Sequence, residues 1–182
     1  MKKAAILLAE GFEEVEAMTP VDLLRRAGIE VKLVSVDNAK TVKGAHNIEI
    51  MVDEQIKNIK AEELDLIILP GGMPGTKYLD ASREVAAIVE SVNKNNKFVA
   101  AICAAPSVLG HLGLLEGKKA VCYPGFEDEL KGAEVLKETV VFDNNIITSR
   151  GMGTAMDFGL KLVELLADKN TAQQLGKGVI YG

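Results

Sequence analysis

Short, nearly unbroken apolar runs constrain the fold of this chain more than any other feature of its sequence. The clearest are Ala4 to Ala9, Leu64 to Leu69 and Phe98 to Ile102, and each meets glycine, proline or cysteine within two residues of its end. A strand covered on one face alternates apolar and polar residues, whereas a strand covered on both faces is apolar throughout. The runs therefore predict parallel strands in a sheet with helices on both sides.

Further segments extend this pattern. Val31 to Val36 is rich in β-branched residues, and two short apolar segments, Val140 to Phe142 and Ile146 to Thr148, flank the turn sequence Asp143-Asn144-Asn145. Residues 39–52 indicate a hairpin-like excursion rather than a strand followed by a helix.

Three stretches with helical periodicity lie between the strands. Val15 to Ala27 precedes Gly28, which suits the position just beyond a helix end, and contains Pro20, which is expected to kink the helix or cost it a hydrogen bond. Ser82 to Asn93 begins at a serine that can cap a helix. Thr154 to Ala167 is expected to bury one stripe, namely Met156, Leu160, Val163 and Ala167. This alternation predicts an α/β fold with a doubly wound parallel sheet.

Composition limits the functions open to this chain. Its 182 residues, 48% hydrophobic and 26% charged, suit one globular domain spanning 1–182. A net charge of -5 without a basic run argues against nucleic-acid binding, and no apolar stretch has the length of a membrane span. Two cysteines and two histidines form neither a disulfide framework nor a predicted metal-ligand cluster. We expect a cytoplasmic protein with reduced thiols, and no metal.

Cys103 is the most informative candidate for chemistry. It ends the run Phe98 to Ile102 and precedes a predicted helix through Val108 and Leu109, at the edge of the sheet where ligands of such folds bind. A nucleophile at a sharp strand-to-helix turn is held exposed, and the helix N-terminus is expected to lower the pKa of the thiol. The alternative is a buried structural cysteine, which is common.

Glu16 and the pair Gly71-Gly72 lie at two other strand ends. Glu16 follows Glu13 and Glu14 at the start of a helix, where acidic side chains suit the helix dipole and usually face solvent. A Glu16 buried beside a thiolate would instead have a raised pKa and could hold a proton there. The backbone amides of Gly71-Gly72, which follow the predicted strand Leu64 to Leu69, can bind an oxyanion. Paired glycines also commonly do no more than form a turn.

Three further candidates are interpreted as carrying no chemistry. His111 and Cys122 are taken as structural. Gly151 and Gly153 match the first two glycines of a G-x-G-x-x-G dinucleotide-binding loop, but Met156 stands at the position of the third glycine. No dinucleotide site is therefore predicted.

Four segments resemble the ThiJ/PfpI superfamily, and most of all the subfamily of the parkinsonism-associated deglycase and its bacterial relatives. In chain order they are AEGFEEVEAMTPVDLLRRAGIEV, IILPGGMPG, FVAAICAAPSVL and ITSRGMGTAMDFGLKLVE. They extend over nearly the whole chain. The resemblance implies a flavodoxin-like single domain, usually a homodimer, that needs no cofactor.

The same resemblance implies roles for individual residues. Cys103 matches the reactive, easily oxidised thiolate, and Glu16 matches its protonated partner. The amides of Gly72 and Ala104 are implied to form an oxyanion pocket. The implied lining of this pocket is Gly71, Gly151 and Met152.

Several positions depart from relatives or have open roles. Superfamily peptidases usually carry histidine directly after the cysteine, where this chain has Ala104, so proteolysis is not expected. Several deglycase relatives carry a histidine near the site where this chain has Tyr123, a poor base at neutral pH. His46 stands where some relatives carry arginine. Arg26 and Arg150 fall at arginine positions of the family, and the candidate pocket therefore includes Tyr123, Arg26 and His46.

Two functions remain open from the sequence. The first is an enzyme that acts on small reactive aldehydes or glycated adducts: the Cys103 thiolate attacks methylglyoxal, Glu16 moves a proton, and lactate is released, as in a glutathione-independent glyoxalase or deglycase. The second is a redox-responsive stress protein or chaperone whose Cys103 is oxidised to the sulfinic acid, stabilised by Glu16. Both need an accessible, reactive thiol, and we favour the enzyme.

Overall fold

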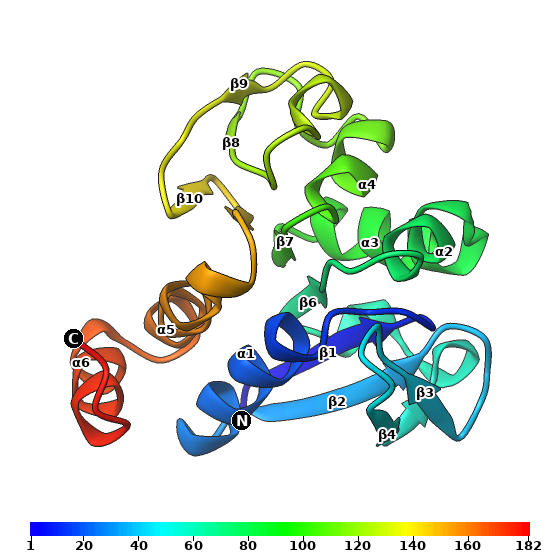
Figure 1. Ribbon diagram of the computed structural model, residues 1–182. Helices are drawn as coiled ribbons and strands as arrows, with labels where there is room; N and C mark the ends of the chain where they lie inside the picture. The colour runs from blue at the N-terminus through cyan, green and yellow to red at the C-terminus, as the bar shows by residue number, and fades with distance from the viewer.

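A seven-stranded sheet runs through the computed structural model, which describes residues 1–182 (Figure 1). Its strand order is β10-β11-β7-β6-β1-β2-β5, and every neighbouring pair is parallel except β10 and β11. The strands are β1 (Lys3–Leu8), β2 (Glu30–Ser35), β5 (Glu54–Gln55), β6 (Leu66–Leu69), β7 (Phe98–Ile102), β10 (Val140–Asp143) and β11 (Ile146–Ser149). The predicted doubly wound sheet is confirmed, with a flavodoxin-like order of its central strands.

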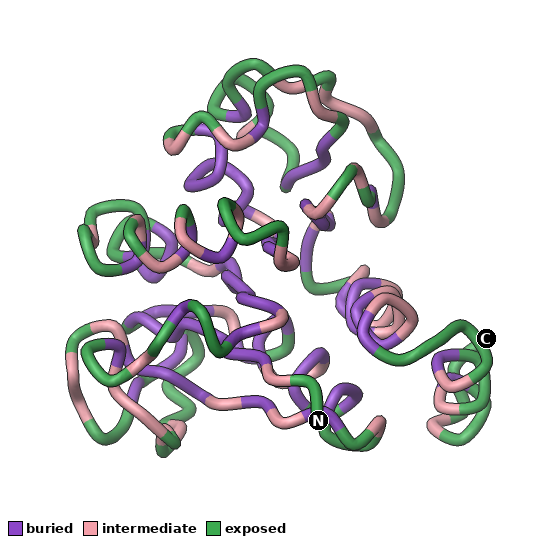
Figure 2. The backbone as a smooth tube through the Cα atoms, turned by 180° about the vertical axis from the view of Figure 1, so that it is seen from behind, coloured by how far each residue is buried: buried purple, intermediate pink, exposed green.

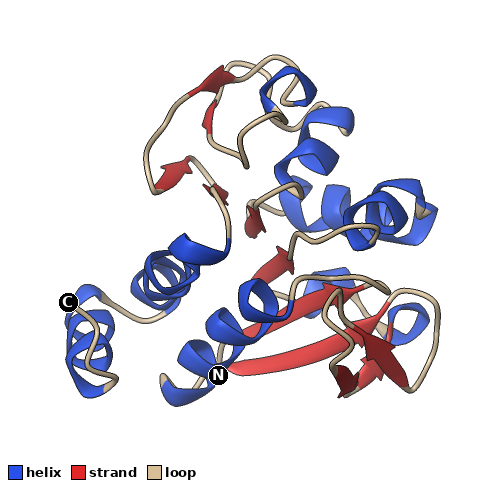
Figure 3. Cartoon of the chain, viewed as in Figure 1, coloured by secondary structure: helices blue, strands red, loops and turns tan.

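Helices lie on both sides of this sheet (Figure 3). They are α1 (Glu14–Arg26), α2 (Gly75–Ala81), α3 (Arg83–Lys94), α4 (Pro106–His111), α5 (Ala155–Leu166) and α6 (Lys169–Gly178). Short 3-10 turns are η1 (Ile56–Asn58), η2 (Ala61–Glu63), η3 (Glu127–Glu129) and η4 (Met152–Thr154). None of the helices combines the length and the apolar character needed to cross a lipid bilayer.

Two small sheets complete the fold. The strands β3 (Thr41–Lys43) and β4 (Glu49–Met51) pair antiparallel, which confirms the hairpin excursion expected within residues 39–52. The strands β8 (Lys119–Ala120) and β9 (Glu134–Val135) pair parallel.

The apolar runs are explained by two core clusters on opposite faces of the sheet. Alternate β1 residues enter different clusters: Ala4, Ile6 and Leu8 join one, and Ala5, Leu7 and Ala9 join the other. The first cluster includes the buried sides of α1 and α5, and the second includes those of α3 and α4. Figure 2 shows the buried strands inside a largely exposed outer chain.

The boundaries of α1 and α3 follow the predicted signals. The carboxylate of Glu13 caps α1 by accepting a 2.7 Å hydrogen bond from the Glu16 amide, and Gly28, with φ of 76°, follows its end. The hydroxyl of Ser82 caps α3 by accepting from the Val85 amide at 3.3 Å. Pro20 lies buried within α1 and does not end the helix.

The buried stripe predicted for α5 is wrong. The buried residues are Ala155, Phe158, Gly159, Leu162, Val163 and Leu166, so only Val163 of the predicted stripe is fully buried. The reason is that α5 is apolar on more than one side, because α6 packs beside it. A Cβ built on Gly176 of α6 would lie 3.4 Å from the Leu160 side chain.

Candidate active site

Cys103 lies on the turn between β7 and α4 in a conformation that is rare for residues other than glycine. Its φ of 66° falls in the left-handed region. Two neighbouring segments hold it there: the Cys103 amide donates to the Ser149 carbonyl at 3.0 Å, and the Tyr123 amide donates to the Cys103 carbonyl at 2.8 Å. Such a conformation persists where surrounding contacts over-determine it, and it matches the geometry of a nucleophile elbow.

Glu16 brings a carboxyl group to this thiol from the first turn of α1. Its side chain is 1% exposed, so the alternative of a solvent-facing Glu16 is wrong. One carboxylate oxygen accepts from the Gly71 amide at 3.0 Å, and the carboxyl group is also hydrogen-bonded to the Cys103 thiol. Burial raises the pKa of Glu16 to about 7, because a charged carboxylate is poorly solvated there.

The pKa of the Cys103 thiol is raised, contrary to the expectation from the sequence. Burial, followed by the charge of Glu16 and its hydrogen bond, raises this pKa to about 12. These effects outweigh the amides of Ala104 and Gly72, which favour the thiolate.

The two groups therefore titrate as a pair. The pair holds two protons well below pH 7 and one proton above it. When Glu16 keeps the single proton, it is neutral, it no longer repels the sulfur, and it can donate a hydrogen bond to the thiolate. The thiolate of Cys103 thus depends on the proton held by Glu16.

Glycines let the loop that follows β6 approach Cys103 and Glu16 closely. A Cβ on Gly71 would lie 2.5 Å from a Glu16 carboxylate oxygen and 2.6 Å from the Cys103 Cβ. Gly72 has φ of 93°, and its amide faces the sulfur together with the amide of Ala104. Two amides directed at one reacting centre are the arrangement that stabilises a developing oxyanion.

The segment after β11 closes another side of the site. The Met152 amide lies near the Glu16 carboxyl group and favours its charged form, while the Met152 side chain is exposed. A Cβ on Gly151 would lie 3.3 Å from the ring of Tyr123, which is half exposed, and 3.9 Å from a Glu16 oxygen. The structure thus gathers eight candidates at one edge of the sheet: Cys103, Glu16, Gly71, Gly72, Ala104, Gly151, Met152 and Tyr123.

Of the two arginine positions, only Arg26 lies apart from this group within one chain, because Arg150 directly precedes Gly151. Arg26 is in the last turn of α1, about 15 Å along the helix axis from Glu16, and its side chain pairs with Asp22 at 2.7 Å. Arg150 follows β11, and its charge acts on Cys122 and Glu127. The structure therefore does not bring Arg26 to the pocket.

His46 lies in the β3–β4 hairpin and is tied to Glu14. Its amide donates to one Glu14 oxygen at 2.7 Å, and its Nδ1 lies 2.8 Å from the other. Glu14 is buried, because it anchors the hairpin to α1. The hydrogen bond to Glu14 raises the pKa of His46.

Glu13, Glu14 and His46 offer atoms within 4.8 Å of one another, so three potential metal ligands do meet, contrary to the expectation from the sequence. Their spacing in the chain gave no signal of this meeting. Both Glu14 oxygens already accept from His46. The cluster is therefore fully explained as a hairpin anchor.

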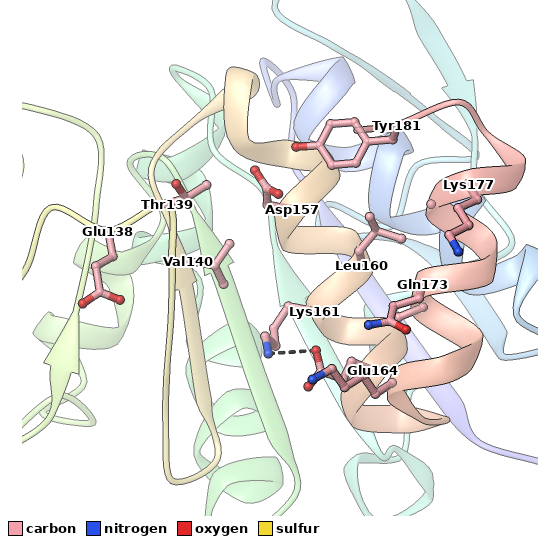
Figure 4. A pocket seen from close by; sticks show the side chains of 13 residues that line it. Glu138, Thr139, Val140, Asp157, Leu160, Lys161, Glu164, Gln173, Lys177 and Tyr181 are labelled. Carbon is pink, nitrogen blue, oxygen red and sulfur yellow. Dashed lines mark hydrogen bonds and ion pairs between the residues drawn. The ribbon is translucent and has the colours of Figure 1, made fainter.

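A separate groove of about 940 Å³ lies between β10, α5 and α6 (Figure 4). Charged side chains border it, including the ion pair between Lys161 and Glu164 at 2.9 Å. None of the eight candidates gathered at Cys103 lines this groove.

Comparisons with known proteins agree on one family. Residues 2–165 match the DJ-1/PfpI family. Protein dj-1beta of Drosophila melanogaster is 38% identical over 181 residues, covering 98% of this chain and 97% of the relative. The glutathione-independent glyoxalase DJR-1.2 of Caenorhabditis elegans is 34% identical over 179 residues, covering 97% and 95%. The solved structure of oxidized DJ-1 from Toxoplasma gondii has a TM-score of 0.96 and 36% identity, covering 100% of both chains.

Proposed function

The chain belongs to the DJ-1/PfpI family, and we propose that it detoxifies reactive carbonyls as a cofactor-independent glyoxalase or deglycase. The observation that carries this proposal is the pair formed by the partly accessible Cys103 and the buried Glu16, beside the amides of Gly72 and Ala104. A nucleophile, a proton carrier and two oxyanion donors are what the reaction requires. A relative named as a glutathione-independent glyoxalase supports the same reaction class.

The first step is addition of sulfur to the aldehyde of methylglyoxal. In the reactive form of the pair, Cys103 is a thiolate and Glu16 holds the proton. The sulfur forms a bond to the aldehyde carbon, and the carbonyl electron pair moves to oxygen. The amides of Gly72 and Ala104 stabilise this oxyanion until Glu16 protonates it, which gives a hemithioacetal and a Glu16 carboxylate.

The second step is a proton transfer between two carbons. The Glu16 carboxylate removes the proton from the former aldehyde carbon and returns it to the neighbouring carbon, while the hemithioacetal hydroxyl proton ends on the former ketone oxygen. The aldehyde carbon is thereby oxidised to a thioester and the ketone carbon is reduced to an alcohol, so no external oxidant is needed. Water then cleaves the thioester, releasing lactate and the Cys103 thiol.

Lactate formation from methylglyoxal without glutathione tests the proposal. We expect the unmodified protein to form lactate, and we expect the same of Cys122→Ala, the matched control for Cys103→Ala. We expect Cys103→Ala to form none, because only Cys103 faces Glu16 and the two amides. Equal turnover by the unmodified protein and by Cys103→Ala would contradict the proposal.

Redox sensing is the second candidate function, and the difference between the two thiols favours it. Cys103 is partly accessible, whereas Cys122 is buried. Neutral Glu16 could donate a hydrogen bond to a Cys103 sulfinate, whose formation would alter a partner interaction or a chaperone-like activity. Mass spectrometry after mild peroxide should find Cys103 oxidised first. Oxidation of Cys122 before Cys103 would remove the basis of this candidate.

We also propose that the chain forms a homodimer through the elements beside the site. Val15 on α1, Ile48 in the hairpin turn and Met51 on β4 are exposed by 44%, 53% and 77%. Large apolar side chains that are exposed on α1 and on the adjoining β3–β4 hairpin favour association of two copies of the chain. The proposed compartment is the cytoplasm, where a free thiol stays reduced.

A further inference from the structure

His111 connects three segments of the molecule through its ring. It is the last residue of α4, and its Nδ1 lies 2.9 Å from an Asp80 oxygen on α2. Its Nε2 lies 2.9 Å from a Glu129 oxygen on η3. A neutral imidazole carries only one N–H, whereas the imidazolium carries two. Only the protonated ring can therefore donate to both carboxylates at once.

Two of these segments carry the amides that face the thiol. Thr76, in the first turn of α2, donates from its amide and its hydroxyl to the Gly72 carbonyl, at 2.9 and 3.0 Å. The Ser107 hydroxyl, in the first turn of α4, donates to the Ala104 carbonyl at 2.7 Å. A shift of α2 relative to α4 would therefore change the separation of the Gly72 and Ala104 amides.

The third segment, η3, is linked through Tyr123 to the turn that carries Cys103. The Phe126 amide donates to the Tyr123 carbonyl at 3.1 Å, and the Tyr123 amide donates to the Cys103 carbonyl at 2.8 Å. A Cβ on Gly110 would overlap the Glu129 carbonyl oxygen, so η3 rests directly on α4. The same ring thus holds the segment that carries Tyr123.

We infer that His111 is a positioning residue for the thiol site, whose imidazolium fastens α2 and η3 to α4 and so fixes the Gly72 and Ala104 amides against the Cys103 sulfur. This inference deepens the proposed function, on which it rests, by making the site depend on pH through a residue outside it.

The direction of the pH dependence follows from the groups that face the ring. These are Glu129 from η3 and Asp80 from α2, and Lys131 acts on Glu129 from the same side. Hydrogen bonds to Glu129 and Asp80 raise the pKa of His111 above its ordinary value. Both hydrogen bonds of the His111 ring are therefore made below about pH 6.5, the ordinary pKa of histidine in an unfolded chain. One of them is lost as pH rises through the raised pKa that His111 has in the folded protein.

Alkylation of Cys103 by iodoacetamide between pH 6 and pH 9 tests the inference without requiring turnover. Mass spectrometry would separate modification of Cys103 from that of Cys122. At pH 6 we expect His111→Gln to be alkylated about threefold more slowly, the scale of losing a partly exposed ion pair, because the amides then stabilise the thiolate less well. The ratio to the unmodified protein should return to one as pH rises.

Two further variants sharpen this test. His111→Lys keeps a positive charge from pH 6 to pH 9. We therefore expect its rate of Cys103 alkylation to be near that of the unmodified protein at pH 6, and to lack the change that deprotonation of His111 causes at higher pH. Lys161→Gln removes a charge from the remote pair with Glu164 and should leave the ratio at one throughout.

Two results would overturn the inference. One is a His111→Gln ratio of one at every pH, which, together with a loss of thermal stability, would mean that the ring only ties the fold together. The other is a reduced ratio that does not vary with pH. A failure of lactate formation in the unmodified protein would instead count against the proposed function and leave the alkylation result standing.

Discussion

Gly71 lies where the candidate site has no spare room. Replacing it with alanine would place a Cβ 2.5 Å from a Glu16 oxygen and 2.6 Å from the Cys103 Cβ. We expect Gly71→Ala to lose about 1–3 kcal/mol of stability, as overpacking usually costs, and to lose lactate formation because the pair is pushed apart. Thermal unfolding and the lactate assay would measure both effects.

Gly153→Ala is the matched control for Gly71→Ala. A Cβ on Gly153 meets nothing within 4 Å, so this change should leave stability and turnover nearly unaltered. If Gly71→Ala behaved like Gly153→Ala, the close approach around the pair would not matter to the chemistry.

At the scale of single residues, the sequence predicts positions better than environments. The place of Cys103 at a strand end follows from its apolar run, because the carboxyl ends of parallel strands share one edge. The raised pKa of Cys103 could not be predicted, because it depends on burial and on Glu16, which is brought from another element. The partners of His111 lie 31 and 18 residues away and have no local signature.

At the scale of elements, the contact between α1 and α5 depends on Gly159. A Cβ there would lie 2.6 Å from a Leu23 methyl group and 3.1 Å from the Pro20 Cα. We expect Gly159→Ala to destabilise the fold by about 1–3 kcal/mol, because the backbone of α1 cannot yield as a flexible side chain can. Chemical denaturation would measure the loss.

Gly178→Ala tests whether that loss comes from packing. Gly178 is also helical, at the end of α6, but a Cβ there meets nothing within 4 Å. Alanine normally favours a helix over glycine, so this change should be neutral or stabilising. A similar loss in both variants would contradict the packing argument.

Elements with an unbroken apolar run or with apolar residues at helical spacing were predicted. Short or mostly polar elements were missed. The strand β7 coincides with the run Phe98 to Ile102, and α3 begins after its Ser82 cap. The helices α2 and α6 were not predicted, because α2 is seven residues long and α6 is mostly polar with only Ala172 and Gly176 buried. Their helical state depends on packing against other elements more than on local sequence.

At the scale of the whole molecule, we predict that two copies associate through α1 and the β3–β4 hairpin. Light scattering should give twice the chain mass of 19.5 kDa. Met51→Glu should shift the mass toward one chain, because it would bury a charge in the contact. Ile180→Asp, at an exposed residue near the C-terminus, is the control and should keep the larger mass. A single-chain mass for the unmodified protein would exclude the proposed dimer.

The whole-molecule topology explains why the site could be placed from the sequence at all. The segments that carry Glu16, Gly71, Cys103 and Gly151 follow β1, β6, β7 and β11, and these four strands are neighbours in the sheet. The exclusion of Arg26 from the site could not be predicted, because it depends on the direction in which α1 runs away from this edge.

The central claim is that Cys103 and Glu16 work as one pair, and the pH dependence of kcat/KM for methylglyoxal tests it most directly. Because the pair passes from two protons to one with a pKa of about 7, the rate of the unmodified protein should rise as pH passes that value. Glu16→Gln cannot carry the proton, so its rate should fall by about a hundredfold or more and lose the rise near pH 7. A Glu16→Gln variant that kept both the rate and the rise would contradict the claim.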